Sequence, residues 1–121
     1  MQRKHDLEKI SKVIDNFNLK PKKSLSQNFL LDLNLTKKIA ASISNIKACD
    51  ILEIGPGPGG LTRSLLDLGA RRVVVIEKDA QFLAPLQEIS NFYPNRLTII
   101  HGDALSIDPN SLLTPPIQIV S

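Results

Sequence analysis

The sequence has few cysteines, few aromatic residues and no long apolar run. Cys49 is the single cysteine among 121 residues, so no internal disulfide can form and a reducing compartment, the cytoplasm, is expected. Aromatic residues are only 4% of the chain, which gives no support to base stacking. No stretch approaches the roughly 20 apolar residues of a membrane helix, and the charged first residues lack the apolar core of a signal peptide. We therefore expect a cytoplasmic protein without membrane contact.

The charge balance is mildly basic. The formal net charge is +3 and the isoelectric point is near 9.2, which is weak evidence for an anionic partner such as RNA. The basic stretch "KPKKS", residues 20–24, has no aromatic residues among its lysines. A solvated loop and a contact with RNA phosphates remain equally open for it.

Hydrophobic periodicity changes near residue 50. Before it, apolar residues at helical spacing predict a helix over 5–17 and a second helix capped by Asp32 or Asn34. After it, short apolar runs alternate with helical patterns. The expected strands are 50–54, 71–77, 97–104 and 117–121, and the expected helices are 61–69 and 79–90. Pro85 is expected to kink the last helix or end it early, and 106–116 is interpreted as a surface loop.

This alternation specifies a parallel sheet with helices on both faces. Doubly wound sheets usually have five or more strands, whereas this sequence stops after the fourth. We therefore expect an α/β, Rossmann-like core that is truncated after its fourth strand. The open edge at 117–121 predicts self-association or low stability.

The stretch "CDILEIGPGPGG" carries the strongest functional signal. Its glycines at Gly55, Gly57 and Gly60 have the G-x-G-x-x-G spacing, and the first strand–helix turn of such a sheet touches the ligand. Glycine is needed there because the backbone must turn sharply and approach the ligand closely. The spacing alone fits a dinucleotide or another adenosine-containing cofactor.

Two features of the loop argue against a pyrophosphate. Pro56 and Pro58 have no N–H group, although backbone N–H groups are what cradle a phosphate at a helix N-terminus. Glu53 stands two residues before Gly55, where a carboxylate would repel a phosphate. S-adenosylmethionine carries no phosphate and brings a sulfonium and an ammonium group, so it suits the loop better than NAD.

Acidic residues follow the next two strands. Glu77 ends the second strand about twenty residues after the loop, where an acid accepts hydrogen bonds from ribose hydroxyls. Asp103, in "HGDA" after the third strand, would face the same crevice and accept from an adenine amine. Both acids fit an adenosine cofactor without choosing between the two candidates.

Taken together, "SQNFLLD", "EIGPGPGGLT", "VIEKD" and "HGDAL" resemble the ribosomal RNA adenine dimethyltransferases from about Lys22 to the last residue. The "GPGPGGLT" form is closer to the branch that modifies two adjacent adenines near the 3′ end of small-subunit RNA. The macrolide-resistance branch shares "SQNFL" and usually lacks "GPG". The resemblance implies a class I methyltransferase fold and S-adenosylmethionine as cofactor, with no metal.

The resemblance also implies roles for individual residues. Asn28 and Leu30 would lie over the methionine part of the cofactor, and Gly55 would approach it closely. Glu77 would hold the ribose hydroxyls and Asp103 would bind the adenine amine. Patterning alone would not have selected Asn28 and Leu30.

The family's target-adenine motif, Asn-Leu-Pro-Tyr after the fourth strand, is missing because the sequence stops at Ser121. We therefore expect an N-terminal helix and cofactor loop over 1–33 and an incomplete core over 34–121. The C-terminal helical domain is expected to be absent and the isolated chain to be inactive. Two alternatives stay open: a nicotinamide-dinucleotide-binding oxidoreductase domain, and a non-catalytic RNA or ribosome-assembly module.

Overall fold

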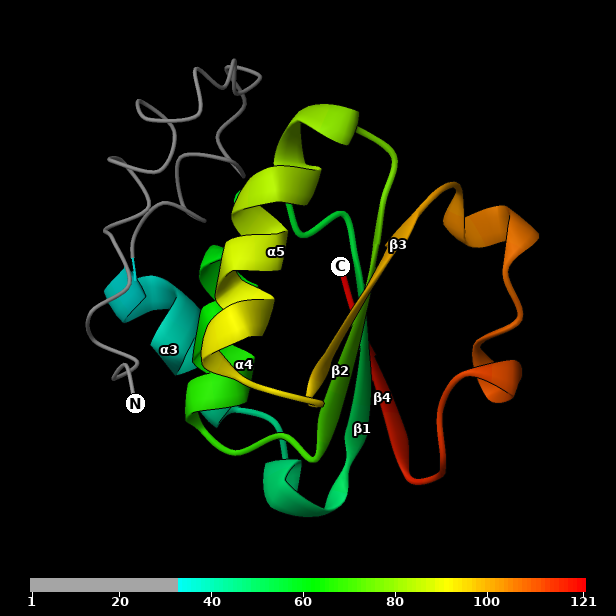
Figure 1. Ribbon diagram of the computed structural model, residues 1–121. Helices are drawn as coiled ribbons and strands as arrows, with labels where there is room; N and C mark the ends of the chain where they lie inside the picture. The colour runs from blue at the N-terminus through cyan, green and yellow to red at the C-terminus, as the bar shows by residue number, and fades with distance from the viewer. Residues whose placement is uncertain (1–32) are drawn as a thin grey trace.

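The protein is built on a sheet of four parallel strands. The computed structural model describes residues 33–121. The strands are β1 (Asp50–Ile54), β2 (Arg72–Glu77), β3 (Leu97–His101) and β4 (Ile117–Val120). They pair in the order β3-β2-β1-β4, and every neighbouring pair is parallel (Figure 1). The four expected strands are thereby confirmed, together with the parallel sheet that their alternation with helices predicts.

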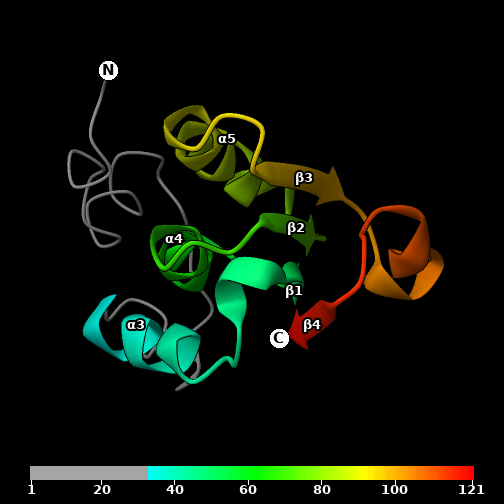
Figure 2. The ribbon, with the colours of Figure 1, turned by 90° about the horizontal axis from the view of Figure 1, so that it is seen from below.

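Three α-helices pack on one face of this sheet. They are α3 (Leu33–Ala41), α4 (Gly60–Asp67) and α5 (Leu83–Phe92), and Figure 2 shows them together on one side of the strands. Leu65 of α4 and Leu86 of α5 are fully buried against Val73 and Val75 of β2. Each such leucine contributes about 1.5–3 kcal/mol by leaving water, so this layer is the main core.

The helix expected over 79–90 forms, but Pro85 does not end it. A 3₁₀ turn, η3 (Ala80–Phe82), comes first, and Asp79 caps it by accepting the Gln81 N–H at 3.1 Å. Pro85 is then the third residue of α5, where a backbone N–H has no partner within the helix. The expectation of an early end is therefore wrong, because the missing N–H of proline is tolerated in a first turn.

The second face of the sheet is covered by the segment 102–116, which holds two 3₁₀ turns. These are η4 (Ala104–Ser106) and η5 (Pro109–Ser111). Leu113 of this segment is buried against Leu52 of β1. The interpretation of 106–116 as a surface loop is therefore incomplete, because the segment also forms the second core layer. Within residues 33–121, all the α-helices lie on one face and only 3₁₀ turns lie on the other.

A buried aspartate fastens this segment to the sheet. Asp50, at the start of β1, accepts the Arg71 Nε–H and the Thr114 N–H, both at 2.8 Å. The Arg71 guanidinium also donates to the Thr114 carbonyl at 2.6 Å. Because a buried carboxylate needs such partners, the network fixes the chain just before it enters β4.

The expectations for the N-terminal residues and for the sheet edge at β4 are not tested by this structure. The helix expected over 5–17 and the cofactor loop with Asn28 and Leu30 lie outside the described residues, so the division at residue 33 stays a prediction. β4 is an edge strand of the described sheet and its Ile119 is 60% exposed, so self-association through this edge also stays a prediction. Within 33–121, no helix has the length and apolar character needed to cross a membrane.

Candidate functional site

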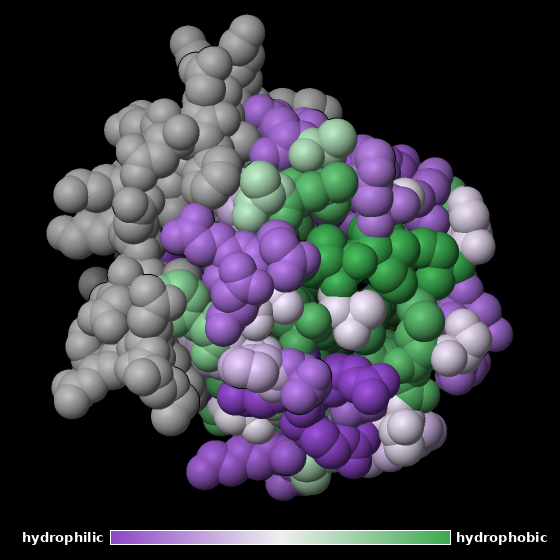
Figure 3. Space-filling model, in the orientation of Figure 1, coloured by the Kyte–Doolittle hydropathy of each residue, from purple (hydrophilic) through white to green (hydrophobic). Residues whose placement is uncertain are grey.

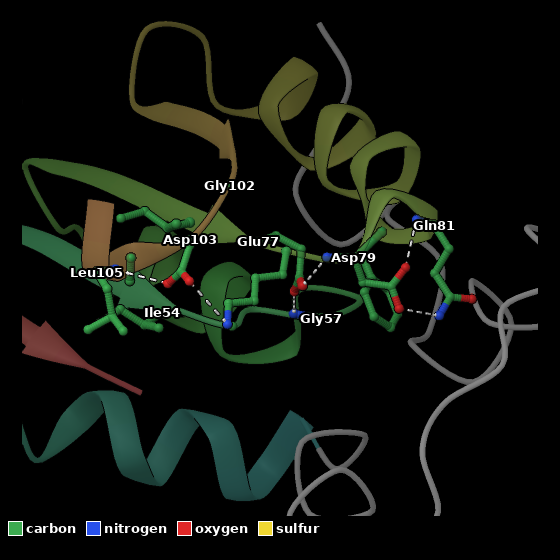
Figure 4. Close-up of a pocket in the computed structure, with 13 residues that line it drawn as sticks. Ile54, Gly57, Glu77, Asp79, Gln81, Gly102, Asp103 and Leu105 are labelled. Carbon is green, nitrogen blue, oxygen red and sulfur yellow. Dashed lines mark hydrogen bonds and ion pairs between the residues drawn. The ribbon is translucent and has the colours of Figure 1, made fainter. Parts of the chain in front are cut away.

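A pocket of about 500 Å³ lies at the carboxyl ends of β1, β2 and β3 (Figure 4). Its lining includes Ile54, Gly55, Glu77, Lys78, Gly102 and Asp103. Its volume is that of a small-molecule site, and parallel α/β sheets bind their ligands at this edge. The structure thus brings Gly55, Glu77 and Asp103 to one pocket, and their contact with a ligand stays a prediction.

The backbone N–H groups of the glycine loop between β1 and α4 are used in hydrogen bonds within the protein. Gly55 N–H donates to the Ile76 carbonyl at 2.9 Å, Gly57 N–H to Glu77 Oε1 at 2.9 Å, and Gly59 N–H to the Pro56 carbonyl at 3.1 Å. Pro56 and Pro58 have no N–H to offer. Residues 55–59 therefore present no free donor of the kind that a pyrophosphate requires.

The loop contains glycines of two kinds. Gly55 and Gly57 have φ angles of +70° and +56°, and a Cβ at either would meet no atom within 4 Å. Gly59 has a φ of +95°, and a Cβ there would overlap Ile89 Cδ1 and lie 3.2 Å from Leu86 Cδ2. The first two leave open space beside the backbone in the pocket, whereas Gly59 lets the loop pack tightly on α5.

Gly59→Ala is expected to lower the free energy of unfolding by roughly 3 kcal/mol, since it adds overpacking to the cost of a left-handed conformation. Gly57→Ala is the matched control and is expected to cost roughly 1 kcal/mol, because only the conformational cost applies. Urea denaturation of both variants measures the difference. Equal losses would show that the Ile89 side chain moves aside without measurable cost.

Glu77, at the end of β2, joins the glycine loop to the turn after its own strand. The side chain is buried. Its Oε1 accepts the Gly57 N–H and its Oε2 accepts the Asp79 N–H, both at 2.9 Å. Each carboxylate oxygen has a second lone pair, so Glu77 can also accept from two ligand hydroxyls. The loop-holding role is one that sequence reasoning missed.

Asp103 caps η4 and faces the pocket. Its Oδ1 accepts the Leu105 N–H at 3.0 Å, and its Oδ2 lies 3.4 Å from the Lys78 ammonium. The Leu105 N–H is the largest cause that holds the pKa of Asp103 below its usual value. Desolvation, the second-largest cause, raises this pKa, and the nearby Lys78 lowers it further. The carboxylate is therefore ionised at neutral pH and can accept a hydrogen bond from an amine.

Glu53 does not lie beside the ligand pocket, where the sequence suggested it. It is 3% exposed and does not line the pocket. Its Oε1 accepts the hydroxyl of Thr62, in the first turn of α4, at 2.5 Å. Burial raises the pKa of Glu53 to about 7, against the Thr62 hydrogen bond and with the help of the neighbouring Glu77 charge. The expectation that Glu53 repels a phosphate directly is therefore wrong, and Glu77 is the carboxylate that touches the loop.

Two pocket residues were missed by the sequence analysis. Lys78 lines the pocket beside Glu77, and Leu105 lines it with 95% of its surface exposed. Figure 3 shows hydrophobic side chains gathered over β3 and the segment 102–116. The signal for both residues was their position, one residue after Glu77 and two after Asp103. Among residues 33–121, no cluster of three or more His, Cys, Asp or Glu side chains gathers as metal ligands do.

Solved structures share this fold. A dimethyladenosine transferase from Plasmodium falciparum is 27% identical with a TM-score of 0.53, over 73% of this chain and 29% of that chain. A magnesium protoporphyrin IX methyltransferase from Synechocystis, with S-adenosylhomocysteine bound, is 15% identical with a TM-score of 0.56, over 88% of this chain and 52% of that chain. The fold is therefore the class I methyltransferase fold.

Curated proteins match much more closely. Ribosomal RNA small subunit methyltransferase A of Paracoccus denitrificans is 59% identical over 112 residues, which are 93% of this chain and 40% of that protein. Its namesake in Roseobacter denitrificans is 61% identical over 109 residues, 90% of this chain and 39% of that protein. The chain thus spans about two fifths of the length of these relatives. The family model for "Ribosomal RNA adenine dimethylase" matches residues 18–120, and the chain belongs to that family.

Proposed function

We propose that this chain forms the S-adenosylmethionine-binding part of an enzyme that dimethylates adjacent adenines near the 3′ end of small-subunit ribosomal RNA. The observation that carries the cofactor assignment is the state of the glycine loop, in which no N–H of residues 55–59 is free. The RNA substrate rests on the names of the relatives.

The pocket residues fit an adenosine that carries no phosphate. Glu77 has acceptor capacity left for two ribose hydroxyls, and the ionised Asp103 accepts from the exocyclic amine of adenine. The open space beside Gly55 allows the backbone to approach the cofactor. We also propose, from the family resemblance, that Asn28 and Leu30 contact its methionine part.

The bound cofactor supplies a methyl group already activated on a sulfonium. The work of the chain is therefore to orient that methyl group toward the incoming adenine amine, since correct placement supplies much of the acceleration in such a transfer. Glu77 and Asp103 grip the two ends of the adenosine from neighbouring strands. These two contacts would hold the nucleoside part of the cofactor in place.

Calorimetric titration with S-adenosylhomocysteine and, in parallel, NAD tests the assignment. S-adenosylhomocysteine is expected to bind, and NAD is expected to bind at least roughly tenfold more weakly, because its pyrophosphate would lose water without gaining N–H donors from residues 55–59. Equal or tighter binding of NAD would support the oxidoreductase alternative. Absence of binding by S-adenosylhomocysteine would contradict the proposed cofactor site in this chain.

A further inference from the structure

Lys78 bridges two strand ends at the rim of the pocket. Two contacts hold the backbone around Lys78 against the end of β3. The Lys78 carbonyl lies 3.1 Å from His101 Nε2, and the carbonyl of Glu77, the residue before Lys78, accepts the Gly102 N–H at 3.0 Å. From this fixed position its ammonium comes within 3.4 Å of Asp103 Oδ2. The side chain stays 72% exposed, so water still reaches the ammonium.

The Asp103 carboxylate is thereby held between two donors. Leu105 N–H donates to Oδ1 from the η4 side (Figure 4). The ammonium of Lys78, the residue after β2, faces Oδ2. The Leu105 bond belongs to the turn itself and would be present without a ligand. Lys78 is the donor from outside the turn, and its ammonium faces the remaining oxygen.

A bound adenine would cover Asp103 and remove water from its carboxylate, which is 42% exposed in this structure. Removing water from a charged group is costly unless an opposite charge or hydrogen bonds compensate. The adenine amine is neutral and brings only a hydrogen bond. Glu77 and Asp79 line the same pocket and add negative charge. Lys78 is the cation that lines this pocket among the described residues.

We propose that Lys78 is a positioning residue for Asp103, which orients and charge-compensates this carboxylate when the adenine of the cofactor covers it. The proposal rests on the cofactor site proposed above and adds a residue that acts through another side chain. Sharing of Oδ2 is chemically possible, because a carboxylate oxygen accepts two hydrogen bonds.

The proposal predicts that Lys78→Met weakens S-adenosylhomocysteine binding roughly three- to fivefold, the upper range for an exposed ion pair. The variant is expected to fold, because the side chain is mostly solvent-exposed. Lys78→Arg keeps the cation and is expected to restore the affinity. Lys38→Met is the matched control, because it removes the same charge from the exposed surface of α3, away from the pocket.

The pH dependence separates this role from a merely structural one. Binding needs the ionised carboxylate, so affinity falls as the pH drops through the pKa of Asp103. Lys78 lowers that pKa, so its loss moves the fall in affinity to higher pH. His101, Glu77 and Asp79 also lie at this end of the sheet, and they are unchanged in the variant. The Asp103→Asn background below therefore decides whether the shift arises at Asp103 or at these neighbours.

The experiment is calorimetric titration of the full chain with S-adenosylhomocysteine across a pH series and at low and high salt. At low salt, Lys78→Met should bind more weakly than the unmodified chain, and its loss of affinity on acidification should begin at a higher pH. The difference in affinity between the two proteins should shrink at high salt. In an Asp103→Asn background the same change should have no further effect. If that background binds too weakly to titrate, the pH series decides.

Three outcomes would overturn the proposal. Equal affinity and equal pH profiles for Lys78→Met and the unmodified chain would remove the role of Lys78 and leave the cofactor site standing. An undiminished effect in the Asp103→Asn background would show that Lys78 acts directly rather than through Asp103. Failure of the unmodified chain to bind would overturn the cofactor site, and this proposal with it.

Discussion

Glu77→Gln is expected to weaken S-adenosylhomocysteine binding at least roughly 100-fold. In the proposed site the carboxylate accepts two ribose hydroxyls, and a hydrogen bond to a charged group contributes about 1.5–3 kcal/mol. Each 1.4 kcal/mol corresponds to a factor of about ten in affinity. Glutamine keeps the size of the side chain but has only one acceptor oxygen. Its NH₂ group is a donor and cannot accept a hydrogen bond from a hydroxyl or an N–H.

The same substitution is expected to lower the free energy of unfolding by roughly 1–3 kcal/mol, the cost of a buried donor left without a partner. Gly57 and Asp79 both donate an N–H to Glu77, and glutamine can satisfy only one of them. In the proposed site, cofactor binding would therefore depend on the same carboxylate that holds the loop.

Calorimetry at a temperature where circular dichroism shows the variant folded separates the two effects. Glu88→Gln, on α5 and outside the pocket lining, is the matched control for affinity and should leave it unchanged. Unchanged affinity in Glu77→Gln would remove Glu77 from the ribose site. Unchanged stability would contradict the two backbone hydrogen bonds.

The strands and α4 were predictable because their signals are local. Val73, Val74 and Val75 form the unbroken β-branched run that a strand buried on both faces requires,. Gly69 adopts a φ of +97° just after α4, as a helix-ending glycine should. In each case the residues that carry the signal are those that form the element.

The segment 106–116 was not predictable in the same way. Its prolines and serines are turn signals, and they give no information on where the turns pack. Leu113 is buried against the sheet, and Thr114 is held by Asp50, 64 positions earlier in the chain. Contacts over such a distance are set by the topology of the sheet, which a local pattern does not contain.

The candidate site was likewise predictable only in part. The rule that ligands bind at the carboxyl ends of parallel strands was enough to bring together Gly55, Glu77 and Asp103. It could not distinguish Glu53 from Glu77, since both are acids close to a strand end. Only the Thr62 hydroxyl, nine positions further along the chain, shows that Glu53 points under α4 and not into the pocket.

Glu53→Gln is expected to raise the free energy of unfolding at pH 8 by up to roughly 3 kcal/mol. Burial raises the pKa of this carboxyl from 4.5 to about 7, and each pH unit of such a shift corresponds to about 1.4 kcal/mol. Since the folded-state pKa is the higher one, this contribution to stability is fully present below pH 4.5. It is lost as the pH rises through 7.

Stability falls as the pH rises because the ionised Glu53 carboxylate stays buried with few partners that stabilise its charge. In the described part of the chain, neither ion pair includes Glu53, and its hydrogen-bond partner is the neutral Thr62 hydroxyl. Glutamine presents the same acceptor oxygen to Thr62 and never ionises. The variant should therefore lack the fall in stability between pH 4.5 and 7 that Glu53 imposes.

Urea denaturation of both proteins from pH 5 to 8 measures this difference, and Glu88→Gln again serves as the control for the loss of one carboxyl. The curves of the unmodified chain and of Glu53→Gln should lie close together at pH 5 and diverge as the pH rises. Parallel curves would show that Glu53 stays ionised across this range. In that case its charge would be stabilised under α4 by something other than Thr62.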